Sequence, residues 1–238
     1  MALGVRSLIS CIGLGNPGTV SVLGDLFGFV RQRVPTDPEP TAIAEVHLLN
    51  HMQRLQGPHL HVNIIRVGID NFSADEVEKI DYALYKCRNV YAPQGLTLGR
   101  VLHWDISADD ANGRDDIGSE DEAEDLTQEW SVDNNALDVF MVDNISASFV
   151  GLSPVEGTCD KDGKGMNGCL GGEVGRGFDG VARTFAHEIG HYLGLEHRSD
   201  PDNLMTQTGN AASVRDSVEL TDAQGRDMRD HCFMRSGC

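Results

Sequence analysis

The chain has 238 residues, a formal net charge of −18 at pH 7 and a hydrophobic content of 40%. This length accommodates one large domain, alone or with an extension, and the hydrophobic content is ordinary for a protein with a buried core. The negative charge argues against nucleic acid and anionic membranes as partners, because their phosphates would be repelled, and no apolar run approaches the length of a transmembrane helix.

The chain is predicted to divide near residue 58, with a helical N-terminal extension or propeptide-like region at residues 1–57 and the main domain at residues 58–238. Apolar residues with helical spacing run through residues 19–34, and a proline cluster follows them. Residues 42–55 form a second expected helix. A propeptide remnant and a packing arm are both consistent with this pattern.

Two motifs of the extension carry little weight. Residues 13–18 match G-x-G-x-x-G, but Pro17 lies inside the motif and no parallel-sheet unit surrounds it. A turn is therefore a better interpretation than dinucleotide binding. His47 and His51 are four residues apart, yet no glutamate follows His47 and no third ligand is evident, so exposed helix histidines are expected.

The main domain begins with a strand followed by a helix. Residues 60–67 are rich in branched apolar residues, which is typical of a buried strand. Ser73 and Glu76 form a capping box that predicts the start of a long helix. The buried face of this helix is expected at Val77, Ile80, Leu84 and Cys87.

Three further strands are expected at residues 96–106, at residues 137–142 and, as an edge strand, at residues 146–152. Trp104 and Trp130 are expected in the core rather than on a substrate platform. Strands, a long helix and further helices in one domain predict an α+β fold.

The acidic run at residues 109–125 is expected to be a solvated loop. Residues 160–163 resemble the start of a calcium loop, but Lys164 and Gly171 stand where an EF-hand needs oxygen ligands. Structural calcium therefore lacks a clear motif and is only a secondary hypothesis.

The most informative stretch runs from His187 to His197 and reads H-E-I-G-H-Y-L-G-L-E-H. On the helix predicted over residues 178–193, His187 and His191 share one face, so both can bind one Zn²⁺. Glu188 can reach a water at the metal as general base. Gly194 can take the left-handed conformation that ends a helix, and the returning chain then delivers His197 as third ligand.

The pattern H-E-x-x-H-x-x-G-x-x-H resembles the signature of the metzincin zinc endopeptidases. Met205 lies eight residues beyond His197 and resembles the Met-turn methionine of that family. Residues 183–186, 203–205 and 220–224 resemble the pappalysin branch, and matrixins share several of these features. Gln207 stands where some metzincins carry a tyrosine that helps to hold the metal or the transition state, so that role is absent or filled otherwise.

The resemblance, which extends over residues 59–238, implies a zincin fold: a twisted mixed sheet with a long helix behind it, a zinc helix and a C-terminal helix. It also implies one catalytic zinc and a protein or peptide substrate, extended across the cleft and paired with an edge strand. Thr206, Gln207 and Thr208 are candidates for the wall of the specificity pocket.

Two other interpretations compete with a peptidase. The alternative is a catalytically silent metzincin-fold module that binds proteins. Glu188 argues against this alternative, because a structural site needs no general base. A zinc hydrolase acting on other amides is a third option.

The end of the chain is predicted to form a helix over residues 221–232, with Thr221 as N-cap and Gln224 completing a capping box. Six cysteines leave several pairings open. Cys159 could pair with Cys169, and Cys232 could pair with Cys238 or attach the tail elsewhere. An even count in an apparent protease favours a secreted, extracellular protein, although residues 1–15 form no convincing signal peptide.

Overall fold

The computed structural model describes residues 57–236. The two helices expected before residue 57, the glycine-rich motif and the pair His47 and His51 lie outside the described residues. The division of the chain near residue 58 stays a prediction. None of the described helices is long and apolar enough to cross a membrane.

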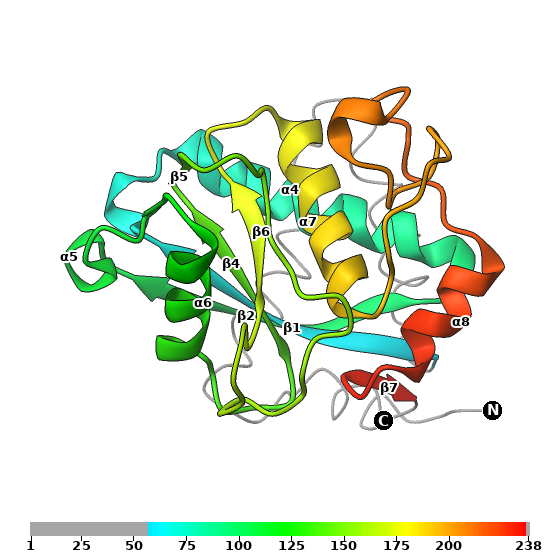
Figure 1. Ribbon diagram of the computed structural model, residues 1–238, viewed down its shortest axis with the longest axis horizontal. Helices are drawn as coiled ribbons and strands as arrows, with labels where there is room; N and C mark the ends of the chain where they lie inside the picture. Colours follow the sequence, from blue (N-terminus) through cyan, green and yellow to red (C-terminus); the bar gives the residue numbers. More distant parts are fainter. Residues whose placement is uncertain (1–56, 237–238) are drawn as a thin grey trace, which may run out of the picture.

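A mostly parallel sheet forms the centre of the molecule (Figure 1). Its four parallel strands lie in the order β2-β1-β4-β6. They are β1 (Pro58–Val67), β2 (Thr97–Ile106), β4 (Leu137–Val142) and β6 (Cys169–Glu173). A short last strand, β7 (Met234–Ser236), runs antiparallel to the start of β1 and makes the sheet mixed.

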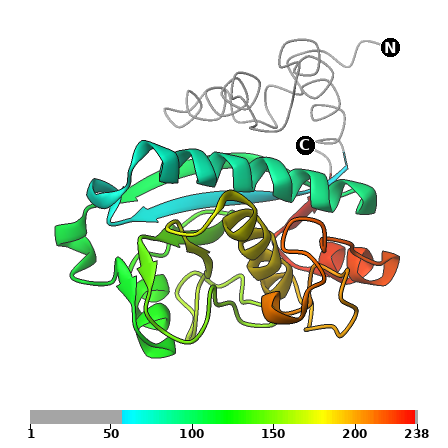
Figure 2. The same ribbon diagram turned by 90° about the horizontal axis from the view of Figure 1, so that it is seen from above.

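Side chains alternate between the two faces of the sheet, as the pleat of a strand requires. On β1, Val62 and Ile64 belong to one core cluster, and Ile65 and Val67 belong to the other. The first face carries α4 (Ala74–Tyr91) and α7 (Phe178–Tyr192), which also pack against each other. Figure 2 shows α4 running beside β1 across the width of the molecule.

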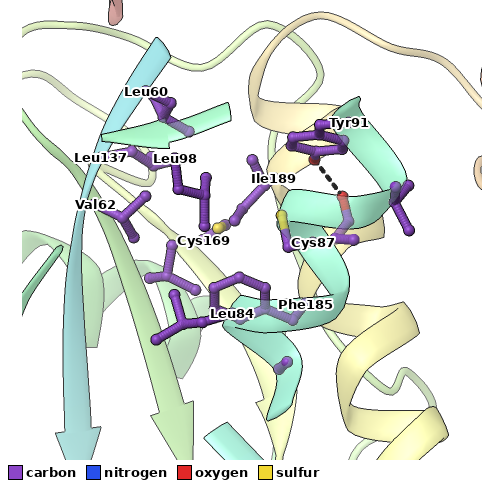
Figure 3. Close-up of a cluster of buried hydrophobic side chains, with 14 of the residues drawn as sticks. Leu60, Val62, Leu84, Cys87, Tyr91, Leu98, Leu137, Cys169, Phe185 and Ile189 are labelled. Carbon is purple, nitrogen blue, oxygen red and sulfur yellow. Dashed lines mark hydrogen bonds between the residues drawn. The ribbon is translucent and has the colours of Figure 1, made fainter. Parts of the chain in front are cut away.

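The contact between α4 and α7 fixes the helix that carries the histidine motif. Figure 3 shows Leu84 and Cys87 of α4 facing Phe185 and Ile189 of α7. The hydroxyl of Tyr91 donates a hydrogen bond of 2.7 Å to the backbone carbonyl of Ala186 inside this contact. Full burial of each large apolar side chain contributes roughly 1.5–3 kcal/mol, so α7 is held rigidly from behind.

The second face is covered by α5 (Ala108–Ala111), α6 (Glu120–Glu129) and the small parallel sheet of β3 (Asp116–Ile117) and β5 (Asn144–Ile145). The expectation of a solvated loop at residues 109–125 is therefore wrong, because this stretch contains most of α5, the strand β3 and the first half of α6. The side chain of Ser119 caps α6 by accepting a hydrogen bond from the Glu122 backbone, and Ala123 and Leu126 bury its inner face.

Both predicted capping boxes are present. Ser73 and Glu76 begin α4, and Thr221 and Gln224 begin the C-terminal helix α8 (Asp222–Asp230). Three short 3-10 helices complete the described part: η1 (Ile69–Asn71), η2 (Ala92–Gln94) and η3 (Thr208–Asn210).

The edge strand expected at residues 146–152 is reduced to a single antiparallel bridge between Leu152 and Leu170 of β6. The reason is that the backbone N–H groups of Ser146 and Ala147 bond to the carbonyl of Ile117 instead. The segment at residues 148–153 nevertheless follows the outer edge of β6 at Leu152.

The tryptophans do not both lie in the core. Trp104 is 43% exposed on the edge strand β2, where its indole N–H donates to Asn63, so its expected burial is wrong. Trp130 is partly buried against the second core cluster.

The disulfide differs from both expected pairs and agrees with the alternative that Cys232 attaches the tail elsewhere. Cys159 forms a disulfide with Cys232, so the pairing of Cys159 with Cys169 and that of Cys232 with Cys238 are wrong, and the bridge attaches the C-terminal segment to the loop before β6. Cys169 is a buried free thiol in β6, and Cys87 is one in α4, as its apolar surroundings predict.

Candidate metal centre

Three imidazoles converge at the end of α7. His187 and His191 lie one turn apart on the same face of this helix, and their Nε2 atoms are 3.0 Å apart. Gly194, with a φ of 97°, ends the helix, and the returning chain brings the Nε2 atom of His197 to 3.1 Å from that of His191. The three nitrogens lie on one side of a cleft, where they could hold one metal ion.

The protonation of the two helix histidines suits a metal. The Nδ1 atom of His187 lies 2.8 Å from the carbonyl of Leu204, and that of His191 lies 2.6 Å from the carbonyl of Leu195. A carbonyl only accepts, so each Nδ1 carries the proton and each Nε2 presents a lone pair. Burial lowers the pKa of His187 to about 3 and also lowers that of His191, which keeps both rings neutral.

Converging lone pairs repel one another unless a cation lies between them. Neutral imidazole nitrogens are preferred ligands of Zn²⁺, and a set of three leaves an open coordination position. The donor set of this centre therefore fits a catalytic zinc.

A second group of potential ligands, Cys159, His231 and Cys232, also converges in the described part of the chain. The disulfide takes up both sulfurs of this group. Within residues 57–236, no three acidic side chains converge closely enough to hold an ion, so structural calcium gains no support.

Glu188 lies beside the three histidines, and its side chain lines the cleft. The residue is only 6% exposed, and burial raises the pKa of its carboxyl to about 8. Gly151 faces it so closely that a Cβ atom at this position would lie 2.8 Å from Cγ of Glu188 and 2.6 Å from Cγ2 of Thr184. The absence of a side chain at Gly151 therefore makes room for Glu188.

Met205 is fully buried and packs against α7. Its sulfur approaches Gly190, where a Cβ atom would lie 2.8 Å from Sδ. The backbone N–H of Met205 donates to the side chain of Asn203, which in turn exchanges hydrogen bonds with Gln224 of α8. The turn around Met205 is thus fixed from two sides.

The cleft has a volume of about 520 Å³. Besides the histidines and Glu188, its walls comprise Glu120, Ser148, Phe149, Val150, Gly151, Leu152, Ser153, Thr184, Gln207, Thr208 and Gly209. Gln207 and Thr208 thus lie where the sequence places the pocket wall. Thr206 does not line the cleft, because it is buried and its hydroxyl donates to the backbone carbonyls of Arg198 and Asp200.

Sequence reasoning missed the contributions of Gly151 and Glu120 to the cleft. No local pattern marks Gly151, since its role depends on a tertiary approach to Glu188. Glu120 could have been placed on a helix from the sequence S-E-D-E at residues 119–122, which matches a capping box.

Comparison with known proteins agrees with this geometry. The profile of the matrixin family matches residues 105–228, which is more than half of the chain. No curated protein matches the chain significantly.

Among solved structures, metalloproteinase-II from Bacteroides fragilis is similar, with a TM-score of 0.51, 17% identity, and coverage of 74% of this chain and 53% of that one. The chain thus spans about half the length of that metalloproteinase. Archaemetzincin from Methanopyrus kandleri aligns with a TM-score of 0.49 and 13% identity over 73% of this chain and 95% of that one. The likeness to the Bacteroides structure supports a zincin fold.

Proposed function

The chain belongs to the matrixin family, and we propose on this basis that it is a zinc-dependent endopeptidase that hydrolyses peptide bonds of proteins. The observation that carries the proposal is the convergence of three imidazole Nε2 atoms beside a buried carboxyl in one cleft. His187, His191 and His197 are the proposed ligands. A zinc ion bound by three imidazoles supplies Lewis acidity and lowers the pKa of a coordinated water to about 7.

Glu188 is the proposed general base. Its carboxylate takes a proton from the attacking water and returns it to the nitrogen of the departing amine. The buried setting makes this carboxyl hold a proton more firmly than in water, as its raised pKa of about 8 indicates.

The substrate is proposed to be an extended peptide that lies in the cleft along residues 148–153. This segment bonds to Leu170 of β6 through Leu152, so its other edge faces away from the sheet. An extended chain can add there through backbone hydrogen bonds. Gln207 and Thr208 would contact its side chains from the opposite wall. The disulfide between Cys159 and Cys232 is consistent with secretion, which we also propose.

The test compares the native chain with Glu188→Ala and Glu188→Gln, measuring zinc content and cleavage of casein or a mixed peptide library. Both variants should bind one zinc, because Glu188 is not a proposed ligand, and both should lose several orders of magnitude in activity. Glu196→Gln is the matched control, since this glutamate lies in the same motif but outside the cleft, and it should cleave like the native chain.

Other outcomes would contradict parts of the proposal. A native chain without zinc would refute the metal centre. Zinc with no cleavage of any library peptide would favour the protein-binding module. Cleavage of non-peptide amides alone would indicate another zinc hydrolase.

A further inference from the structure

Arg183 lies on α7 one turn before His187 and is only 3% exposed. Its guanidinium donates hydrogen bonds to five oxygens of the chain that follows the metal centre. Nε bonds to the carbonyl of Ser217 at 3.1 Å, and Nη1 bonds to the hydroxyl of Thr208 at 3.1 Å. Nη2 faces the carbonyls of Leu204 at 3.0 Å, Asn203 at 3.4 Å and Thr206.

This arrangement is unusual for a buried cation. No carboxylate of residues 57–236 forms an ion pair with Arg183, and burial lowers the pKa of its guanidinium. Removing such a charge from water costs several kcal/mol, and an apolar side chain could fill the same space at lower cost. What an apolar residue could not supply is a rigid fork of donors that fixes several oxygens at once.

The oxygens that accept from Arg183 belong to residues next to a candidate ligand and to a residue of the cleft wall. The Leu204 carbonyl that accepts from Arg183 also accepts from Nδ1 of His187, at 2.8 Å, and thereby orients this imidazole. Thr208, whose hydroxyl accepts from Arg183, lines the cleft. Arg183 itself does not line the cleft, so it cannot touch a substrate there.

We propose that Arg183 is a positioning residue that fixes residues 203–208 against α7 and so sets the orientation of His187 together with the cleft wall at Thr208. The positioning role rests on the proposed function, because it concerns a proposed zinc ligand. The hydrogen bonds of Arg183 do not depend on that function.

A second cavity, of about 210 Å³, offers a direct way to test this role. Its lining includes Arg183 and Asp179 of α7, Asn89 and Val90 of α4, and Val214 and Arg215 of the loop that follows η3. Val214 is 38% exposed, so the cavity opens to solvent. In Arg183→Ala, a free guanidinium ion could enter by this route and occupy the vacated position.

The experiment measures zinc affinity by chelator competition, and kcat and KM on a peptide, for the native chain, Arg183→Ala, Arg183→Lys and Arg215→Ala. Arg183→Ala should lose about 10- to 100-fold in both zinc affinity and kcat/KM, the usual effect of removing a group that orients a ligand. Millimolar guanidinium chloride should restore part of both losses, whereas an equal concentration of sodium chloride should not.

The other two variants serve as controls. Arg183→Lys keeps the charge but has one nitrogen, so it should fall between native and Arg183→Ala. Arg215→Ala removes an arginine from the same cavity without touching residues 203–208. Its zinc affinity and kcat/KM should equal those of the native chain, and guanidinium should not change them.

A folded Arg183→Ala with native zinc affinity and native kcat/KM would overturn the inference. If Arg183→Ala does not fold, Arg183→Lys replaces it, and native values for that variant would overturn the inference equally. If the native chain cleaves no peptide, the proposed function fails, and zinc affinity with guanidinium rescue still decides the role of Arg183.

Discussion

Gly151 shows how one missing side chain shapes the candidate site. Its Cα faces Thr184 and Glu188, both buried on α7, and no space for a methyl group separates them. Thr184 is β-branched and cannot rotate away easily. An added Cβ atom must therefore displace the carboxyl of Glu188 or push residues 148–153 outward, and either shift alters the cleft.

Gly151→Ala is expected to reduce kcat while leaving zinc content unchanged, because the atoms nearest to the added Cβ belong to Thr184 and Glu188, and neither residue is a proposed ligand. Overpacking of this kind typically lowers the free energy of unfolding by about 1–3 kcal/mol. Gly209→Ala is the matched control, since Gly209 lines the same cleft but has nothing within 4 Å of its added Cβ. Steady-state kinetics and thermal unfolding of both variants check the prediction, and equal kinetics for the two alanine variants would contradict it.

Some residues of the candidate site can be predicted from the sequence and others cannot, for a physical reason. His187, His191 and His197 lie within one helix and the turn after it, so their spacing alone brings them together. Gly151 and Arg183 act on segments that are distant in sequence, or through contacts made only after folding. The periodicity of apolar residues along the chain does not reveal such tertiary contacts.

The same contrast holds for elements. Strands β1, β2 and β4 and helices α4, α7 and α8 follow from apolar periodicity and capping boxes within each segment. The edge segment at residues 146–152 has a strand-like composition, yet its start bonds to Ile117 rather than to β6. Which partner a strand pairs with depends on tertiary contacts and cannot be read from its own composition. Strand β6 has the sequence C-L-G-G-E, which contains too few apolar residues to be predicted as a strand.

His61 connects the two neighbouring strands β1 and β2 through a contact that depends on its charge. Its Nδ1 atom accepts a hydrogen bond of 3.0 Å from the backbone N–H of Arg100, so the ring is neutral. Burial, together with the smaller effects of the charges of Arg100, His59 and Arg235, lowers the pKa of His61 to about 3. The unfolded chain has an ordinary histidine pKa of about 6.5. Between this pH and the pKa of the folded state, His61 therefore binds a proton in the unfolded chain but not in the folded chain.

This difference destabilises the fold as the pH decreases. Each unit below about 6.5 removes up to about 1.4 kcal/mol from the free energy of unfolding, until the pKa of the folded state is reached. His61→Asn keeps an acceptor near the position of Nδ1 and cannot titrate. The loss of stability between about pH 7 and pH 5 should therefore be smaller than in the native chain, by about 2 kcal/mol. Urea denaturation at both pH values measures it, and an unchanged difference would exclude His61 as the source.

At the scale of the whole molecule, the C-terminal segment is attached both to the central sheet and to the loop that contacts the end of α7. Strand β7 pairs with the start of β1, and Cys232 is bonded to Cys159 across a sequence separation of 73. The loop before Cys159 contacts the end of α7, because the N–H of Glu156 bonds to the carbonyl of His191 and that of Gly157 bonds to Tyr192. The disulfide thus links the tail to the backbone of a proposed ligand.

Removing this bridge should loosen the molecule without dismantling the metal centre. The double variant Cys159→Ser with Cys232→Ser is expected to lose about 2–4 kcal/mol in free energy of unfolding, because the unfolded chain regains the freedom that the closed loop denied it. Three contacts that remain without the bridge still hold the loop on α7: Tyr192 donates to the Thr158 carbonyl at 2.7 Å, the Gly157 N–H donates to the Tyr192 carbonyl at 2.8 Å, and the Glu156 N–H donates to the His191 carbonyl at 3.0 Å. His231 of the C-terminal segment also lies 2.9 Å from the Gly157 carbonyl of this loop. Zinc binding should therefore persist.

Denaturation with and without a reducing agent provides the check. The native chain should lose stability on reduction and the double variant should not, since the other two cysteines within residues 57–236, Cys87 and Cys169, are buried free thiols. A non-reducing peptide map of the native chain should contain the Cys159 and Cys232 peptides as one species. A double variant that is as sensitive to reduction as the native chain would mean that another bridge carries the stability, and the role predicted for the Cys159–Cys232 bridge would be wrong.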